Sequence, residues 1–197
     1  MLNITLDAVR SAYDNLNYRW HPVFNLFGIR TLNGEPDAFD DFIGCAYNDP
    51  ETPGTEFSLS AYHATTDPGI AFLNHPDNPN GTAVLKCGQY TDSHKPGFHR
   101  GNKAHPALIQ AAPLTVWRDR NRDNKPDIGG RIQTGMFGLN IHRANLVLPA
   151  EHIGLWSAGC QVFRKAASLA KVLAMARLTG LSRFTYTLLN ESDIIKA

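Results

Sequence analysis

The sequence predicts an α+β fold built mainly of β-strands, with one long helix near the C-terminus and a shorter helix at the N-terminus. Short segments with strand character alternate with turn-rich segments over most of the chain, and the 16 glycines and 12 prolines favour many turns. An apolar repeat at helical spacing occupies residues 161–178. Apolar residues make up 43% of the 197 residues, which is enough for a packed core and argues against disorder.

A helix is predicted near each end of the chain. In residues 6–16, Leu6, Val9 and Tyr13 recur at three- and four-residue spacing, and Asp7 supplies a carboxylate to the first turn. The same spacing predicts the long helix over residues 161–178, which ends at Gly180. Its apolar positions are Val162, Ala166, Leu169, Ala170, Leu173 and Ala176.

Strands are predicted where apolar and polar residues alternate or where short apolar runs lie between turn residues. The expected strands are 26–30, 39–47, 56–63, 82–86, 114–118, 138–142 and 184–189. Turn residues cluster at 33–36 and 49–54. We expect a single catalytic domain over residues 1–197, in which residues 80–190 form the core and residues 1–80 are available for an extra lobe.

Composition bears on the partners of the chain. The 19 basic and 18 acidic residues leave a formal net charge of +1, which lacks the excess of basic residues typical of nucleic-acid-binding proteins. No apolar run reaches the roughly 18 residues of a membrane-spanning helix, and residues 1–7 do not read as a secretory signal. The three cysteines form no metal-binding spacing and no disulfide framework. We therefore expect a monomer without metal or cofactor, and without a membrane or nucleic-acid partner.

The candidate catalytic residues lie between 142 and 160. A predicted strand delivers His142, and after about a dozen residues Ser157, Gly159 and Cys160 form a turn into the long helix. The positive end of a helix dipole and a nearby imidazole both stabilise a thiolate, so Cys160 is predicted as nucleophile and His142 as base. Backbone N–H groups of Gly159 and Cys160 are expected to form an oxyanion hole. The hydroxyl of Ser157 or a backbone carbonyl would orient the imidazole.

This arrangement resembles the catalytic signature of the YkuD-type L,D-transpeptidase family, in which a strand histidine precedes a Ser-x-Gly-Cys turn. Lys95–Phe98 is similar to that family's Thr-Pro-x-Gly-x-Phe strand entry. The resemblance covers residues 80–190 and is specific over residues 139–162. It implies a mainly β catalytic fold without cofactor that acts on stem peptides of peptidoglycan, at the bacterial cell wall or in the periplasm.

The sequence departs from the family's pattern beside both catalytic residues. Arg143 stands where the family has glycine, and Gln161 and Val162 stand where it has isoleucine or valine and then arginine. The missing arginine is the family's contact to a substrate carboxylate, and Arg143 or Arg164 would have to replace it. These departures indicate a divergent branch, such as cell-wall-cleaving proteins of phage-lysis type. The residues expected to contact substrate are His99, Arg143, Trp156 and Gln161.

Other interpretations stay open. Hydrolysis is the favoured outcome, and an exported L,D-transpeptidase that cross-links peptidoglycan is the first alternative. A non-catalytic wall-binding or virion structural module is the second, and an unrelated cysteine protease acting on proteins is a weaker third. If the protein is the non-catalytic module, Cys160 is an inert buried thiol, His142 a core histidine and Ser157 a helix cap. The segment Asp119–Asp127 resembles the start of a calcium loop, but missing ligands favour a solvated hairpin turn.

Overall fold

Eight strands form a closed barrel that mixes parallel and antiparallel pairs. The computed structural model describes residues 2–32, 34–48 and 57–196. The barrel strands are β1 (Phe24–Arg30), β2 (Asp41–Tyr47), β3 (Ser58–Thr65), β5 (Gly88–Phe98), β6 (Pro106–Gln110), β9 (Ile141–Arg143), β10 (Gln161–Phe163) and β11 (Phe184–Asn190). Their order around the barrel is β1-β11-β5-β6-β9-β10-β3-β2. The pairs β1–β11 and β9–β10 are parallel, and β1, β2 and β3 close the barrel with strands from the rest of the chain.

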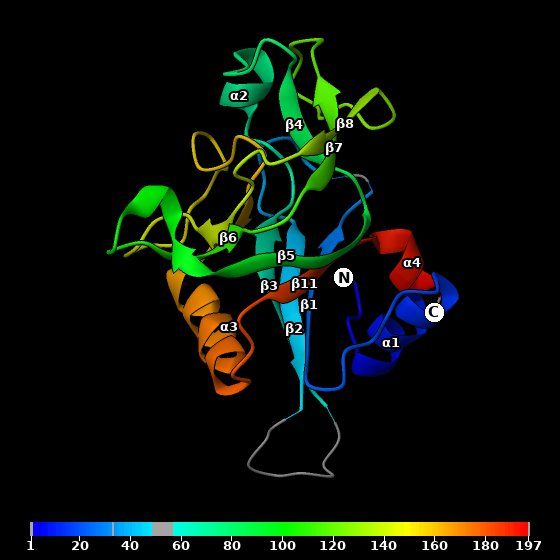
Figure 1. Ribbon diagram of the computed structural model, residues 1–197. Helices are drawn as coiled ribbons and strands as arrows, with labels where there is room; N and C mark the ends of the chain where they lie inside the picture. Colours follow the sequence, from blue (N-terminus) through cyan, green and yellow to red (C-terminus); the bar gives the residue numbers. More distant parts are fainter. Residues whose placement is uncertain (1, 33, 49–56, 197) are drawn as a thin grey trace.

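A second, smaller sheet and short helices surround the barrel. The sheet has the order β4-β7-β8 and consists of β4 (Thr82–Leu85), β7 (Leu114–Asp119) and β8 (Arg131–Gly135). The helices are α1 (Leu6–Asn15), α2 (Ile70–Asn74), α3 (Ala166–Leu178) and α4 (Glu191–Ile195), with one 3-10 turn, η1 (His99–Gly101). In Figure 1 the small sheet and α2 stand at one end of the barrel, and α1 and α4 lie together beside it.

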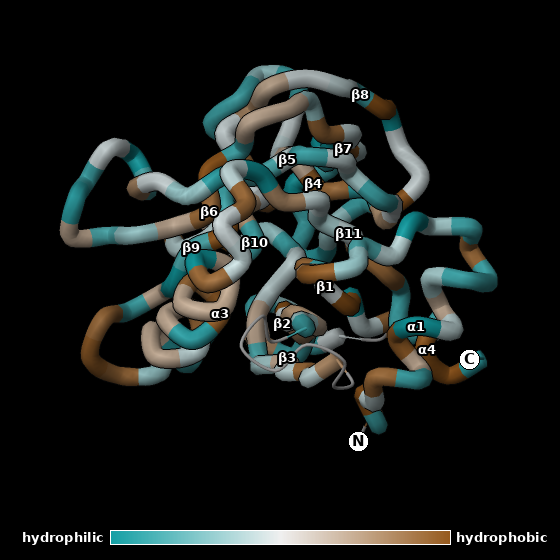
Figure 2. The backbone as a smooth tube through the Cα atoms, turned by 60° about the horizontal axis from the view of Figure 1, so that its bottom comes forward, coloured by the Kyte–Doolittle hydropathy of each residue, from teal (hydrophilic) through white to brown (hydrophobic). Residues whose placement is uncertain are grey.

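Strand β1 shows how the two faces of a barrel strand are used. Successive side chains of a strand point to opposite faces. Leu26 joins the main hydrophobic core, to which α3 contributes Leu169 and Val172. Phe27, one residue on, packs in a second cluster with Val9 of α1. The strand therefore has no solvent-facing side. Helix α3 lies against strands β2, β6, β9 and β10 of the barrel (Figure 2).

The expected N-terminal helix is present as α1. Thr5 caps it, because its side-chain oxygen accepts a hydrogen bond from the backbone N–H of Ala8 at 3.1 Å. Val9, Ala12 and Tyr13 form its buried face, as the apolar spacing indicates. None of the helices in the described part of the chain is both long and apolar enough to span a membrane.

The prediction of one long C-terminal helix over residues 161–178 is wrong. The segment contains strand β10 followed by α3, which has 13 residues and begins at Ala166. All three residues of β10 are buried, so Val162 and Phe163 are apolar because they lie in a barrel strand covered on both faces. Val162 happens to fall four residues before Ala166, and this coincidence extended the helical repeat backwards by five residues.

The predicted α+β class with an L,D-transpeptidase-like fold is likewise wrong, because the described residues form a closed mixed barrel with four short helices. The prediction missed β5, β6 and β8. Strand β5 has few buried side chains, contains Pro96, and reaches a positive φ of 50° at Asp92, so its sequence lacks a regular alternation. The register with β11 shifts between Phe184 and Tyr186, which is typical of a bulge.

Two further expectations concern loops. The turn cluster at 49–54, the turn residue Asn33 and the start of the strand expected at Glu56 lie outside the described residues. The segment from Asp119 to Asp127 is a hairpin loop between β7 and β8. Several of its oxygens are used within the turn. Oδ2 of Asp119 accepts from the Asp127 N–H at 2.8 Å, and the Asn121 amide donates to Asp123 and Asp127, each at 3.0 Å. Oδ1 of Asp119 is buried and has no hydrogen-bond partner among the described residues.

Candidate active site

Three side chains that can carry chemistry come together from three separate elements. His99 begins η1, at the end of β5, His142 is the central residue of β9, and Cys160 directly precedes β10. The parallel pairing of β9 with β10 sets Val162 opposite His142, and thereby brings Cys160 beside Asn140. A ring nitrogen of each histidine and the Sγ atom of Cys160 all lie within 4.8 Å of one another.

This cluster borders a cavity of about 630 Å³ where the small sheet meets the barrel. A cavity of this size accommodates a short peptide or a similar ligand. The residues lining it are Phe72, Asp77, Asn78, Gly81, Thr82, Ala83, His99, Arg100, Arg118, Met136, Phe137, Gly138, Leu139, Asn140, Ala158 and Cys160. His142 is buried and stacks on the ring of His99, with 4.0 Å between the ring centroids. The cavity therefore reaches Cys160 and His99 directly, and His142 lies behind them.

The hydrogen bonds of His142 define its tautomer. Its Nδ1 atom lies 2.8 Å from the backbone carbonyl oxygen of Arg143, which can only accept, so Nδ1 carries the proton. Its Nε2 atom is buried and has no hydrogen-bond partner among the described residues. A neutral His142 therefore keeps an unused lone pair on Nε2, as a general base requires. The imidazole of His142 is therefore oriented by the backbone carbonyl of Arg143, and a backbone carbonyl is one of the two groups expected to orient it.

His99 is held in the opposite tautomer. The backbone N–H of Gln110 donates to Oδ1 of Asn140 at 2.9 Å, which fixes the orientation of that side-chain amide. The Nδ2 group of Asn140 then faces Nδ1 of His99 at 3.2 Å and donates to it. Because Nδ1 of His99 accepts, the proton of the neutral ring is on Nε2. His99 is thus an N–H donor, whereas His142 offers a lone pair.

Two histidines and a cysteine are also ligands that Zn²⁺ prefers. Ligation through Nε2 of His99 would move its proton to Nδ1, where it would face the N–H groups of Asn140. Turning the Asn140 amide to relieve this would place those N–H groups against the N–H of Gln110. The polar surroundings therefore fit a thiol–imidazole pair better than a metal centre.

Burial controls the protonation of the cluster. It raises the pKa of the Cys160 thiol to about 11, although the Asn140 backbone N–H and Arg100 act in the opposite direction. Burial, and then His99, lower the pKa of His142 to about 3. Both groups are therefore neutral in the resting protein at neutral pH. The expected stabilisation of a thiolate by a helix dipole is wrong, because Cys160 directly precedes strand β10 and not a helix. Cys160 is also only 9% exposed, and burial favours the neutral thiol.

Ser157 and Gly159 shape the turn that carries Cys160. The hydroxyl of Ser157 donates to the carbonyl oxygen of Cys160 at 2.7 Å and accepts from the N–H of Gly159 at 3.2 Å. Gly159 has a φ of 116°, and a Cβ atom there would lie 2.3 Å from the carbonyl oxygen of Ala83, so only glycine fits. Since Ser157 uses the Gly159 N–H, the oxyanion hole expected from that group is not formed. The N–H of Cys160 has no acceptor in the described part of the chain.

Gln161 supports this turn from the buried side. Its amide nitrogen donates to the carbonyl oxygens of Gly159 and Thr66, each at 3.3 Å. Its Oε1 atom accepts from the hydroxyl of Tyr186 at 3.0 Å. Gln161 is fully buried and does not line the cavity, so its side chain holds the backbone next to Cys160.

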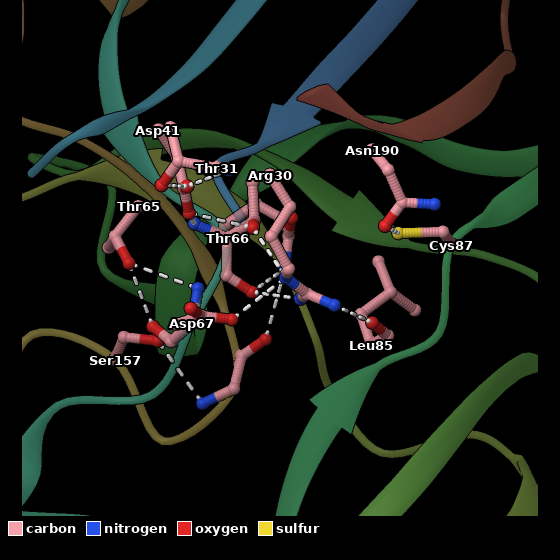
Figure 3. Close-up of polar contacts among 12 residues, drawn as sticks. Arg30, Thr31, Asp41, Thr65, Thr66, Asp67, Leu85, Cys87, Ser157 and Asn190 are labelled. Carbon is pink, nitrogen blue, oxygen red and sulfur yellow. Dashed lines mark hydrogen bonds and ion pairs between the residues drawn. The ribbon is translucent and has the colours of Figure 1, made fainter. Parts of the chain in front are cut away.

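The same network continues to Arg30. Its guanidinium donates to the carbonyl and hydroxyl oxygens of Thr66 at 2.8 and 3.0 Å, and to the carbonyl oxygen of Leu85 at 2.7 Å. It also forms an ion pair with Asp67 at 2.9 Å (Figure 3). Asp41 accepts from the N–H and the hydroxyl of Thr66. Polar contacts therefore link strand β1 to the Gly159–Cys160 peptide.

The remaining residues expected to contact substrate lie away from the cavity wall. The guanidinium of Arg143 donates to the carbonyl oxygens of Ala144 and Ala104, at 3.0 and 3.4 Å. That of Arg164 donates to the carbonyl oxygen of Ala150 at 2.9 Å. Trp156 is 39% exposed and is not among the lining residues. Of the four expected contacts, His99 alone borders the cavity.

Sequence reasoning did not single out Asn140, His105 or Arg118 as part of the site. Asn140 lies two residues before His142, so period-2 alternation could have placed both on one face of the strand. His105 lies 5.3 Å from His142 between ring centroids, and its Nε2 faces the same Arg143 carbonyl at 3.3 Å. No local signal connects Arg118 to Cys160, because their proximity depends on the packing of the small sheet on the barrel.

The chain matches no family model, and neither a curated protein nor a solved structure shows detectable similarity to it. The function proposed below therefore rests on the geometry of the site.

Proposed function

We propose that the protein is a cysteine-dependent acyl-transfer enzyme. The observation that carries this proposal is the proximity of a thiol on the cavity wall to a buried imidazole with a free ring nitrogen. Cys160 borders the 630 Å³ cavity, a ring nitrogen of His142 lies within 4.8 Å of its Sγ atom, and Nε2 of His142 has no hydrogen-bond partner among the described residues. A buried polar atom without a hydrogen-bond partner lowers the stability of the fold, and such atoms are concentrated at functional sites.

The proposed reaction begins with a peptide amide in the cavity. Sγ of Cys160 attacks the carbonyl carbon while His142 takes the thiol proton on Nε2, so charge separates only as the S–C bond forms. The N–H groups of Cys160 and His99 are the donors proposed for the resulting oxyanion. His142 then returns the proton to the leaving amine, the C–N bond breaks and a thioester remains. Water attacks the thioester, loses its proton to His142, and releases the acid and the thiol.

For the substrate we propose stem peptides of peptidoglycan, with the protein acting at the bacterial cell wall. The order of strand histidine and Ser-x-Gly-Cys turn supports this choice, because it is where the chain resembles the L,D-transpeptidase signature. An amine acceptor in place of water would give cross-linking, so hydrolase and transpeptidase differ only in the group that attacks the thioester. We propose hydrolysis as the main outcome.

The test is mass analysis of purified muropeptides incubated with the wild-type protein and with variants. Cys160→Ala removes the proposed nucleophile. Cys87→Ala is the matched control, because the Cys87 sulfur contacts Asn190 and lies outside the cavity wall. We expect shortened products from the wild type and Cys87→Ala, and none from Cys160→Ala. Equal products from Cys160→Ala would exclude the nucleophile, and no product from the wild type would favour a non-catalytic wall-binding or virion module.

A further inference from the structure

The cavity that reaches Cys160 has a buried cation in its wall. Arg118, on β7, is 5% exposed and lines the cavity together with the thiol. Nη1 of Arg118 donates to the carbonyl oxygen of Gly81 at 3.1 Å, and Nε donates to the side-chain oxygen of Gln133 at 2.8 Å. The guanidinium lies over the ring of Phe137, 4.6 Å from its centroid. These contacts hold the group in place without adding a negative charge.

Arg118 has no counter-ion in the described part of the chain. No described carboxylate lies within 4.0 Å of it, and the one acidic residue lining the cavity, Asp77, is exposed. The other deeply buried arginine, Arg30, has an ion pair with Asp67 at 2.9 Å. A buried charge is normally paired because desolvation is expensive. The same protein therefore neutralises one buried guanidinium and leaves the other open toward the cavity.

The surroundings strengthen the positive potential at this place. Arg131 is the cross-strand partner of Arg118 in the β7–β8 ladder, and Arg100 lines the same cavity. Burial, followed by the charge of Arg131, lowers the pKa of Arg118. Arginine nevertheless stays protonated at neutral pH. An anion that enters the cavity would thus meet a desolvated, oriented cation.

We propose that Arg118 is a carboxylate-binding residue, and that the cavity takes a peptide whose free carboxylate sits on Arg118 while its amide carbonyl faces Cys160. Nη2 has no acceptor among the described residues and Nη1 has a second hydrogen, so the two can bind a carboxylate with two parallel hydrogen bonds. Arg143 and Arg164, the replacements expected from sequence, bond to backbone carbonyls elsewhere. This inference rests on the proposed acyl transfer for the placement of the amide.

A first experiment changes the ligand and leaves the protein intact. Turnover is measured for a muropeptide with a free terminal carboxylate and for the same muropeptide with that group converted to a carboxamide. We expect kcat/KM to fall at least about tenfold for the carboxamide, since a charge-assisted bidentate contact is lost. In Arg118→Gln the two substrates should react at equal, low rates. Discrimination between them that persists in Arg118→Gln would overturn the proposal.

Controls separate the lost charge from a disturbed fold. Arg131→Gln removes a positive charge directly across the ladder but outside the cavity wall, and should keep the preference for the free carboxylate. Arg118→Lys keeps a charge without the planar fork, so its preference should be intermediate. A preference lost equally in Arg131→Gln and Arg118→Gln would show that general electrostatics, and not Arg118, selects the substrate.

A binding measurement distinguishes this inference from the catalytic proposal. N-acetylalanine and its amide are titrated into the Cys160→Ala protein and followed by NMR shifts of the indole and amide signals. We expect at least about tenfold tighter binding of the acid, and loss of that difference when Arg118→Gln is added. Acid-selective binding that depends on Arg118, together with no turnover of muropeptides by the wild-type protein, would retain the anion site and reject the enzyme. Equal binding of acid and amide would reject the anion site whether or not the protein is an enzyme.

Discussion

The imidazole rings of His99 and His142 stack with 4.0 Å between their centroids, yet their surroundings hold them in opposite tautomers. The Arg143 carbonyl places the proton of His142 on Nδ1. Asn140 donates to Nδ1 of His99 and so places the proton of that ring on Nε2. One ring is thereby prepared to take a proton and the other to donate a hydrogen bond, next to the same thiol.

Substitutions that imitate one ring nitrogen at a time test this division. His142→Asn keeps a donor near Nδ1 for the Arg143 carbonyl but removes the base, so turnover should fall about a hundredfold or more. His99→Gln keeps an N–H near the position of Nε2, and should retain far more activity than His99→Met. Steady-state rates on muropeptides measure both effects. Similar losses in His99→Gln and His99→Met would contradict the donor role of His99.

The protonation of the resting thiol predicts its reactivity. Because burial raises the pKa of Cys160 to about 11, the thiolate fraction is small at neutral pH and grows as the pH rises toward that value. Alkylation of Cys160 by iodoacetamide should therefore be slower than that of a model thiol, and should accelerate with pH without a plateau at mildly acidic pH. Peptide mass mapping separates Cys160 from Cys45 and Cys87. A fast, pH-independent reaction at mildly acidic pH would instead indicate a preformed thiolate–imidazolium pair.

The contact between Gln161 and Tyr186 predicts an energetic coupling. Gln161→Leu leaves the buried hydroxyl of Tyr186 without its acceptor, and should lower the free energy of unfolding by about 1–3 kcal/mol. Tyr186→Phe in the Gln161→Leu background should cost little more, which gives a coupling of about 1 kcal/mol in a double-mutant cycle. Denaturant unfolding of the four proteins measures it. Additive effects of the two substitutions would show that the hydrogen bond does not support the turn.

A buried histidine predicts loss of stability in acid. His94 is fully buried between the Ser93 hydroxyl and the Leu139 carbonyl, and burial lowers its pKa from 6.5 to about 4. Between these two values the unfolded chain binds the proton and the folded chain does not, so stability falls as the pH falls through this window. The full effect is about 3 kcal/mol.

The measurement is the difference between wild type and His94→Gln at each pH. This subtraction removes the contribution of Asp67, whose pKa burial raises to about 6 and which therefore acts with the opposite sign. The wild type should lose more stability than His94→Gln between pH 6.5 and about 4. Parallel pH profiles of the two proteins would contradict the buried neutral state of His94.

The sequence predicted local features well where a single pattern decided them. The helix at α1 follows from the spacing of Leu6, Val9 and Tyr13 and from the Asp7 carboxylate in its first turn. Strands β4, β7 and β11 follow from short runs between turn residues. The barrel itself could not be predicted, because its closure depends on pairs far apart in the chain, such as β1 with β11. Strand β10 was assigned to a helix because a three-residue strand has too few positions to show a period of two.

The sequence pointed to some of the residues of the candidate cluster and not to their protonation. The motif pointed to Cys160 and His142, and the structure places both in one cluster with His99. Their neutral protonation follows from burial, which the sequence does not reveal. Arg118 was missed for a related reason, since an unpaired buried charge can be recognised only when all of its neighbours are known.

The role of Cys160 as nucleophile is tested most directly by the intact mass of the protein during turnover of a muropeptide. We expect a covalent adduct equal in mass to the acyl part of the substrate, mapped to Cys160 and sensitive to hydroxylamine, as a thioester is. It should be present in wild type and Cys87→Ala and absent in Cys160→Ala. Muropeptide cleavage without an adduct, and undiminished in Cys160→Ala, would contradict the account.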